Sequence, residues 1–153
     1  MRIGDICTRE VIYCGRDAGV LEVAQLMRNH HVGDLIVAET RNGRLQPLGI
    51  VTDRDLVVKV LAEAVVAEAL TAGDLMTREL VTAGEAESVH VAIERMRAEG
   101  VRRLPVVGAD GALVGVLSAD DVTEYLAEEL TGLAHIAPRQ SVLEKAALPP
   151  LGN

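Results

Sequence analysis

The sequence predicts an α+β fold made of two tandem strand–helix–strand–strand–helix repeats that are related by an approximate two-fold axis. The stretch GIVTDRD at 49–55 recurs as GVLSADD at 115–121, a shift of 66 residues (115 − 49). The stretch IGDICTREV at 3–11 recurs as AGDLMTREL at 72–80, a shift of 69 residues (72 − 3). Each repeat is too small to bury its own sheet well, so we expect the two sheets to pack together.

Each repeat is expected to open with a short strand, around Val11–Ile12 in the first and Val81–Thr82 in the second. Apolar residues then recur at i, i+3, i+4 and i+7: Val20, Val23, Ala24 and Met27 in the first repeat, and Val89, Ala92, Ile93 and Met96 in the second. This spacing places them on one face of a helix, so an amphipathic helix is predicted in each repeat.

A hairpin and a second helix complete each repeat. HVGDLIVA at 31–38 and GVRRLPVV at 100–107 are apolar strands, and an Asn-Gly or Asp-Gly turn signal follows each of them. Such turns fold the next apolar run back as an antiparallel strand. Helices are expected after the hairpins, at about 53–70 and 119–130.

The duplication divides the chain into a first repeat with its linking helix at 1–70, a second repeat at 71–130 and a C-terminal tail at 131–153. The tail lies outside the duplication and carries Pro138, Pro149 and Pro150. Because proline interrupts regular structure and chain ends are often loosely held, the tail is expected to form a short helix with loose ends.

Charge and composition exclude several classes of function. The formal net charge of −8 opposes binding to nucleic-acid phosphates and to anionic membrane surfaces. The chain has no Phe or Trp, so it lacks the aromatic platforms on which single-stranded bases stack. It starts without an apolar signal-peptide core, and its most apolar helical stretch is interrupted by Lys59, Glu63 and Glu68. We expect a cytoplasmic protein with no nucleic-acid or membrane partner.

Cysteine and histidine residues do not form a metal pattern. Two cysteines without a second ligand cluster fall short of a zinc signature. In the duplication Cys7 and Cys14 align with Met76 and Ala83, which are ordinary apolar positions. The adjacent pair His30–His31 stands near a helix end, where neighbouring side chains point in different directions. No metal site is expected.

Thr52 and Asp55 in the first motif, and Ser118 and Asp121 in the second, allow two interpretations. A hydroxyl residue followed three positions later by an acid at a strand-to-helix junction is a capping box, which satisfies backbone N–H groups of the first helical turn. The same geometry suits a nucleotide. A helix N-terminus and a hydroxyl donate to phosphate, and a carboxylate one turn along accepts from the ribose hydroxyls. The residues alone leave both interpretations open.

The repeated order of elements, DLMT with its counterpart DICT, GVRRLPVV and the two motifs together resemble the paired CBS domains, a family named for cystathionine β-synthase. The resemblance covers residues 1 to about 130. Both motifs fit the family's Gly-apolar-x-Ser/Thr-x-x-Asp/Asn pattern at every fixed position. The resemblance implies a disc-like module that requires no cofactor and binds an adenosyl ligand between its repeats. The implied ligands are AMP, which is favoured, ADP, ATP, NAD or S-adenosylmethionine.

Carried over by position, the resemblance implies that Asp55 and Asp121 hold ribose and that the hydroxyls of Thr52 and Ser118 contact the ligand. The residues implied to flank adenine are Ile50 and Val116, assisted by the first strand of the opposite repeat at Val11, Ile12, Val81 and Thr82.

Arg102 and Arg103 stand where members of the family place phosphate-binding side chains, although a solvated basic edge is the alternative. The matching positions of the first repeat are Gly33 and Asp34. Since a carboxylate repels phosphate, we expect AMP to bind first at the second motif. The site at the first motif should be weaker, or should prefer a less negative ligand.

We expect a regulatory module that senses an adenine nucleotide and passes the ligand state to a regulated protein. The sequence has no G-x-S-x-G elbow, P-loop, HExxH or Cys–His arrangement, so no enzyme activity is expected. A homodimer is expected because the last helix of each repeat carries an apolar stripe. The stripes are Leu56, Val60 and Ala64, and Val122, Tyr125 and Leu126. The alternatives are a dimerisation module without a ligand and an enzyme acting on a nucleotide.

Overall fold

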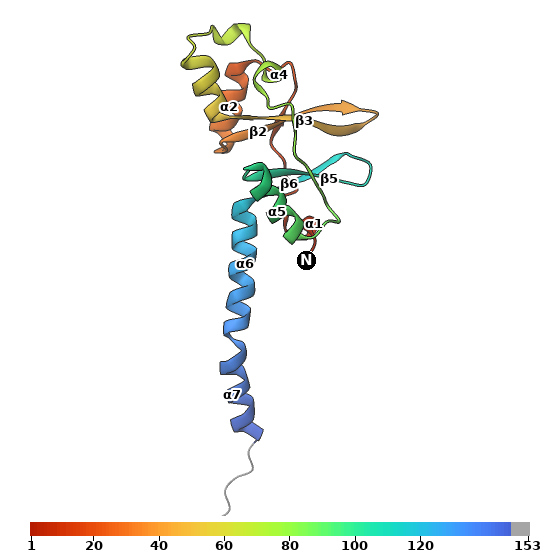
Figure 1. Ribbon diagram of the computed structural model, residues 1–153, viewed down its shortest axis with the longest axis vertical. Helices are drawn as coiled ribbons and strands as arrows, with labels where there is room; N and C mark the ends of the chain where they lie inside the picture. The colour runs from red at the N-terminus through yellow and green to blue at the C-terminus, as the bar shows by residue number, and fades with distance from the viewer. Residues whose placement is uncertain (148–153) are drawn as a thin grey trace, which may run out of the picture.

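Two three-stranded sheets, one in each repeat, form the centre of the protein (Figure 1). The computed structural model describes residues 1–147. The first sheet contains β1 (Tyr13–Cys14), β2 (Asp34–Arg41) and β3 (Arg44–Thr52). The second sheet contains β4 (Ala83–Gly84), β5 (Arg103–Val107) and β6 (Leu113–Ser118). In each sheet the first strand pairs parallel with the second, which pairs antiparallel with the third. The predicted α+β fold of tandem repeats is confirmed.

The two amphipathic helices are α2 (Val20–His30) and α5 (Val89–Glu99). Both bury the predicted face: Val20, Val23 and Met27 are buried in α2, and Val89, Ala92 and Met96 in α5. Each helix ends at a residue in the left-handed conformation, His31 with φ of 54° and Gly100 with φ of 66°. Such a residue closes the helix and turns the chain toward the next strand.

Two short helices, which the sequence pattern did not predict, each pack against the opposite repeat. α1 (Ile3–Ile6) contributes the fully buried Ile3 to the core of the second repeat. α4 (Ala72–Leu75) contributes Ala72 to the core of the first repeat. The N–H groups of Ile3 and Ala72 donate to backbone carbonyls of the other repeat, at 2.9 and 2.8 Å. Each repeat is therefore completed by a segment of its neighbour.

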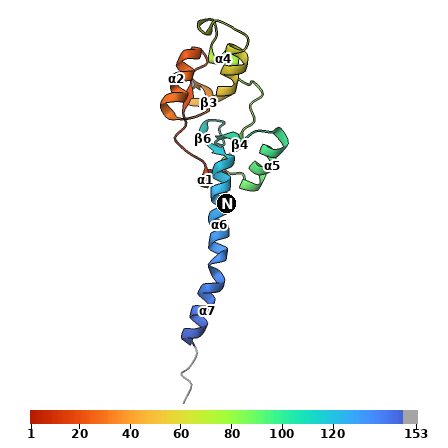
Figure 2. The ribbon, with the colours of Figure 1, turned by 90° about the vertical axis from the view of Figure 1, so that its left-hand side faces the viewer.

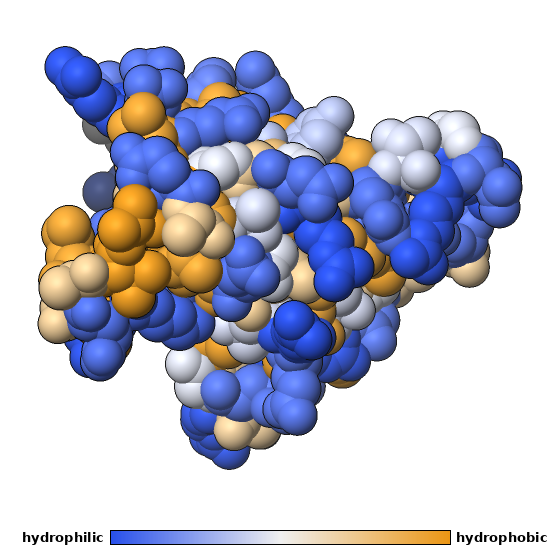
Figure 3. Space-filling view, turned by 90° about the horizontal axis from the view of Figure 1, so that it is seen from above, coloured by the Kyte–Doolittle hydropathy of each residue, from blue (hydrophilic) through white to orange (hydrophobic). Residues whose placement is uncertain are grey.

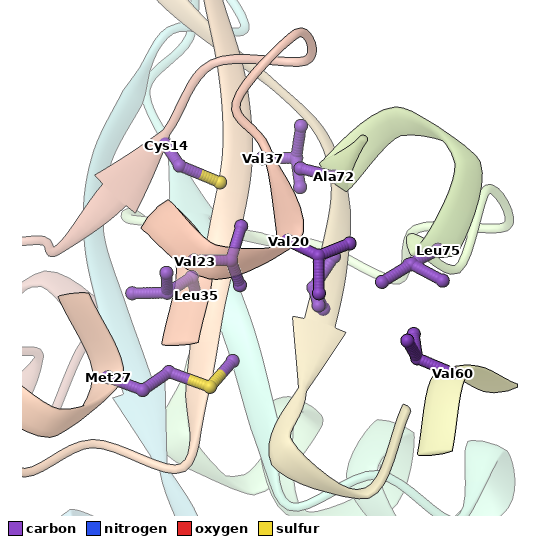
Figure 4. Close-up of a cluster of buried hydrophobic side chains, with 10 residues drawn as sticks. Cys14, Val20, Val23, Met27, Leu35, Val37, Val60, Ala72 and Leu75 are labelled. Atoms are coloured by element: carbon purple, nitrogen blue, oxygen red, sulfur yellow. The ribbon is translucent and has the colours of Figure 1, made fainter. Parts of the chain in front are cut away.

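Each repeat has its own apolar core. The first core consists of Cys14, Val20, Val23, Met27, Leu35, Val37, Val51, Val60, Ala72 and Leu75 (Figure 4). The second consists of Ile3, Ala83, Val89, Ala92, Met96, Leu104, Val106, Leu117 and Val122. Burial raises the pKa of the Cys14 thiol to about 11, and the Glu22 carboxylate adds to this effect. Cys14 is therefore a protonated core residue at neutral pH.

The first strand of each repeat starts two residues later than predicted, because Val11–Ile12 and Val81–Thr82 lie outside the sheets. The preceding segments are bound to the opposite repeat, where Thr8 forms a β-bridge with Val116 and Thr77 forms one with Ile50. The chain thus reaches its own sheet only after this crossing.

The helix predicted at 53–70 is shorter and irregular. α3 (Asp53–Asp55) continues into a π-helical segment, η1 (Leu56–Leu61), and then the chain turns, with Ala64 at a φ of 51°. A 3₁₀ turn, η2 (Ala67–Ala69), precedes the second repeat. The segment η1 reads LVVKVL, and β-branched residues weaken a regular α-helix.

The helix predicted at about 119–130 is longer than expected. It runs as α6 (Ala119–Ala134), and α7 (Ile136–Ala147) continues it into a stalk that leaves the second repeat (Figures 1 and 2). Pro138 lies in the first turn of α7, where a missing N–H costs no helical hydrogen bond. Pro149 and Pro150 lie outside the described residues. No helix within residues 1–147 has both the length and the apolar character needed to span a membrane.

Candidate functional site

The first motif forms a capping box at the end of β3. The Asp55 N–H donates to Thr52 Oγ1 at 3.1 Å. The Asp55 carboxylate in turn accepts from the Thr52 N–H at 2.9 Å and from the Thr52 hydroxyl at 3.0 Å, both at Oδ2. These bonds satisfy backbone donors of the first helical turn and fix the side chains of both residues.

The second motif repeats this arrangement at the end of β6. The Asp121 N–H donates to Ser118 Oγ at 3.0 Å, and Asp121 Oδ2 accepts from the Ser118 N–H and hydroxyl, both at 2.7 Å. The capping interpretation is thus confirmed at both motifs. A ligand role would have to use the oxygen atoms that the caps leave available.

The two motif aspartates differ in their second carboxylate oxygen. Asp55 Oδ1 lies 2.8 Å from Lys59 Nζ, one helical turn further on. Burial raises the pKa of the Asp55 carboxyl, but the hydrogen bonds from Lys59 and Thr52 outweigh burial and hold the pKa below its usual value. The position equivalent to Lys59 in the second repeat is Tyr125, so Asp121 has no such lysine.

The lowered pKa of Asp55 predicts a pH-dependent contribution to stability. A carboxyl whose pKa is lower in the folded than in the unfolded state stabilises the fold above its unfolded-state pKa, and this contribution is lost as the pH falls through the folded-state value. We therefore expect Asp55→Asn to unfold at lower denaturant concentration than wild type at pH 7, and the difference to shrink as the pH approaches 3. Denaturation curves between pH 3 and 7 measure this; a difference that is independent of pH would contradict it.

The glycine that opens each motif is required by the crossing segment of the other repeat. A Cβ atom on Gly49 would lie 2.5 Å from the carbonyl oxygen of Thr77 and 2.8 Å from the sulfur of Met76. A Cβ atom on Gly115 would lie 2.9 Å from the carbonyl oxygen of Thr8 and 2.8 Å from Cys7 Sγ. The two contacts also confirm that Cys7 and Met76 occupy equivalent positions. The motif glycines therefore permit the close approach of the two repeats.

A cavity of about 610 Å³ lies between the repeats. Eight of the fourteen predicted site residues line it: Gly33, Asp34, Ile50, Thr52, Val81, Arg102, Arg103 and Ser118. Its volume is within the range of small-molecule sites. Within residues 1–147, no group of three or more His, Cys, Asp or Glu side chains is arranged to hold a metal ion.

The other six predicted residues do not line this cavity: Asp55, Asp121, Val116, Val11, Ile12 and Thr82. Asp55 does not line the cavity itself, but its carboxylate accepts a hydrogen bond from the hydroxyl of Thr52, which does. Val116 is held by the crossing segment, with which its backbone forms two hydrogen bonds to Thr8 at 2.9 Å each. The cavity is bordered by both motifs, because Ile50 and Thr52 of the first and Ser118 of the second all line it.

Part of the cavity wall was not among the residues predicted from the sequence. Thr77, Glu79 and Leu80 line it from the crossing segment that follows α4, and Asp53 lines it from α3. A signal for the first three was present, because TREL at 77–80 recurs at the start of the first repeat as TREV. The signal did not reveal that each copy of this stretch contacts the motif of the opposite repeat.

Arg103 is not the free cation that was expected at the second motif. Its Nε lies 2.6 Å from Asp34 Oδ2, so the pair joins the two repeats within the cavity. Burial raises the pKa of the Asp34 carboxyl; Arg103 opposes this effect and the Asp53 carboxylate adds to it. Arg102 Nη2 lies 3.1 Å from Asp120 Oδ1, but both side chains are about 80% exposed, so this pair contributes little. A phosphate that approaches Arg103 must compete with Asp34.

Comparison with known families agrees with this geometry. The model of the CBS domain matches residues 3–62 and 72–128, one match in each repeat. Together the two matches span most of the chain. The protein therefore belongs to the CBS domain family, and it contains a pair of CBS domains.

Three similar proteins place this pair in context. An uncharacterized protein of Methanopyrus kandleri is 31% identical over 122 residues, which cover 80% of this chain but only 61% of that protein. The structure of a CBS domain protein from Pyrobaculum aerophilum complexed with AMP has a TM-score of 0.70 and 28% identity, covering 79% of this chain and 89% of that one. The CBS domain pair of protein MJ0100, solved with 5′-methylthioadenosine and S-adenosyl-L-methionine, has a TM-score of 0.70 and 26% identity, covering 84% and 98%.

Proposed function

We propose that this protein is a regulatory module that binds an adenosyl ligand, with AMP as the first candidate, in the cavity between its CBS repeats. The observation that supports the proposal is the make-up of the cavity wall: apolar Ile50, Leu80 and Val81, the hydroxyls of Thr52 and Ser118, and the guanidinium of Arg103. The apolar side chains suit the faces of adenine, and the hydroxyls and guanidinium suit ribose and phosphate. Adenosyl ligands are also bound in the two similar structures.

The charges of the wall oppose ligands with several negative charges, so AMP is favoured over ADP, ATP and NAD. The wall carries four acidic residues and three arginines: Asp34, Asp53, Glu79 and Asp120, and Arg54, Arg102 and Arg103. A monophosphate enters a site that is already slightly negative, and it must draw Arg103 away from Asp34. An uncharged adenosyl ligand leaves that ion pair intact. These charges are consistent with the expectation that the site at the first motif prefers a less negative ligand.

Calorimetry with AMP and with adenosine tests the proposed contacts. Arg103→Ala removes the cation that would contact phosphate, so we expect AMP affinity to fall roughly 10- to 100-fold and adenosine affinity to change much less. Arg97→Ala is the control, because Arg97 is an exposed arginine of α5 outside the cavity. Equal losses for the two ligands would show that Arg103 does not contact phosphate.

Thermal unfolding separates the proposal from its alternatives. A ligand that binds only the folded protein raises its melting temperature by mass action. No shift with saturating AMP, adenosine or S-adenosylmethionine would favour the dimerisation module without a ligand. Consumption of AMP during a long incubation would instead indicate an enzyme.

We infer further that the module acts as a homodimer and signals its ligand state to a regulated protein. Of the apolar stripes expected to pair the copies, Val60 and Val122 are buried in their own cores, whereas Leu126 is exposed. At the end of the first repeat formed by η1 and the turn after it, the exposed apolar side chains are Val57, Val58, Leu61, Val65 and Val66. Figure 3 views the molecule from this end and shows apolar residues gathered there.

A further inference from the structure

The stalk formed by α6 and α7 extends beyond the part of the chain that matches the CBS family, which ends at residue 128. Every residue from 126 to 147 is exposed, and none of α7 is buried. The stalk nevertheless carries large apolar side chains: Leu126, Leu130, Leu133, Ile136, Val142 and Leu143. Most of the stability of a helix in a protein comes from packing of its apolar face, so we expect a partner to cover this face of the stalk.

Four of the six large apolar residues of the stalk follow a heptad spacing, and Glu129 and Gln140 occupy the two polar positions of the same seam. Leu126 and Leu133 are seven residues apart, as are Ile136 and Leu143, and Ile136 follows Leu133 by three. These are the a and d positions of a two-stranded coiled coil. The same pattern crosses the boundary between α6 and α7, so the two helices present one continuous seam.

A hollow of about 510 Å³ lies along this seam. It is lined by Gly132, His135, Ile136, Arg139, Gln140, Leu143 and Glu144. Gly132 has no side chain and leaves room for a large apolar residue of a facing helix. The hollow is therefore suited to a side chain that inserts from a second helix.

The charges of the stalk indicate the direction of the second helix. Glu124, Glu128 and Glu129 are in its first half, which has no basic residue. The second half carries Arg139 and Lys145 with one acid, Glu144, so it is net positive. A parallel pair of stalks would place like charges side by side. An antiparallel pair would place the acidic half of each stalk along the basic residues of the other.

We propose that the stalk pairs with the stalk of a second copy of this chain as an antiparallel two-stranded coiled coil. In the register that aligns the a and d positions, Leu126 of one copy faces Leu143 of the other, and Leu133 faces Ile136. Gln140 then faces Glu129, with Arg139 next to it. This polar layer favours the register, because a shift by one heptad would place Glu129 against Leu133 in one direction and Gln140 against Ile136 in the other. The proposal assigns the homodimer proposed above to the stalk; the exposed apolar residues around η1 lie at the other end of the molecule and take no part in this pairing (Figure 1). It does not rest on ligand binding.

Light scattering on the full chain tests the pairing. Leu133→Asp with Ile136→Asp places charges in the seam and should halve the mass of the assembly. The matched control, Ala127→Asp with Ala134→Asp, adds the same charge to the outer face of the same helix and should leave the mass unchanged. AMP affinity should be unaltered in both variants, which separates this proposal from ligand binding. A wild-type mass near 16.3 kDa, or an unchanged mass in the seam variant, would overturn it.

Disulfide trapping tests the direction. Cys7→Ala with Cys14→Ala removes the native thiols, and Leu126→Cys and Leu143→Cys are introduced on separate chains. The two positions are 17 residues, or about 26 Å, apart along one stalk. A mixture of the two proteins should form a cross-linked dimer on oxidation, whereas each protein alone should not. Cross-linking within the separate samples would indicate parallel stalks and contradict the antiparallel arrangement.

Discussion

Gly49→Ala is expected to lower the free energy of unfolding by about 3 kcal/mol, at the upper end of the usual range for overpacking. The added Cβ would lie 2.5 Å from the carbonyl oxygen of Thr77, and a backbone atom cannot rotate away. The N–H of Thr77 is bonded to the carbonyl of Ile50 at 2.9 Å, so the strain also disrupts the bridge that joins the repeats. Chemical denaturation measures the change.

A matched pair of variants separates this effect from the ordinary consequences of replacing glycine. Gly15→Ala is the control, because a Cβ atom there meets no other atom within 4 Å. Gly115→Ala should behave like Gly49→Ala, with a somewhat smaller loss, since its nearest backbone atom is 2.9 Å away. If Gly49→Ala were as stable as Gly15→Ala, the close crossing of the repeats would be wrong.

The repeats could be predicted from the sequence because their signals are local. The spacing of Val20, Val23 and Met27 and the Asn-Gly turn depend only on nearby residues, and the duplication provides each signal twice. The packing of α1 and α4 against the opposite repeats could not be predicted, because it depends on which core Ile3 enters and which core Ala72 enters. That choice is made by packing between distant segments, and it displaced the predicted first strands by two residues.

The candidate site was predicted in part for the same reason. The hydroxyl of Thr52 and its backbone partner are three residues apart, so the capping box follows from sequence. The ion pair of Arg103 with Asp34 joins residues 69 positions apart (103 − 34), and the duplication presented them as equivalent positions rather than as partners. Equivalent positions near a two-fold axis lie close together, and opposite charges at such a position pair across the axis.

Asp55→Ala is expected to weaken AMP binding by roughly 30- to 1,000-fold if Asp55 holds ribose as proposed, because two charge-assisted hydrogen bonds are lost. In the structure the carboxylate is already engaged, by Thr52 at Oδ2 and by Lys59 at Oδ1. A ribose must therefore displace Lys59. We expect Lys59→Met to bind AMP more tightly than wild type, since it frees Oδ1 and keeps the apolar stem of the side chain.

The pair of variants distinguishes a ligand contact from a helix cap. If Asp55 only caps the helix, Asp55→Ala lowers stability and Lys59→Met leaves AMP affinity unchanged. If Asp55 also holds ribose, the two substitutions shift the affinity in opposite directions. Asp121→Ala provides the comparison, because it removes the equivalent cap from the motif whose aspartate has no lysine one turn on. Calorimetry with AMP on the three variants, with unfolding curves for each, measures both effects. Equal losses of affinity in Asp121→Ala and Asp55→Ala, accompanied by equal losses of stability, would assign the effect to folding rather than to contact with the ligand.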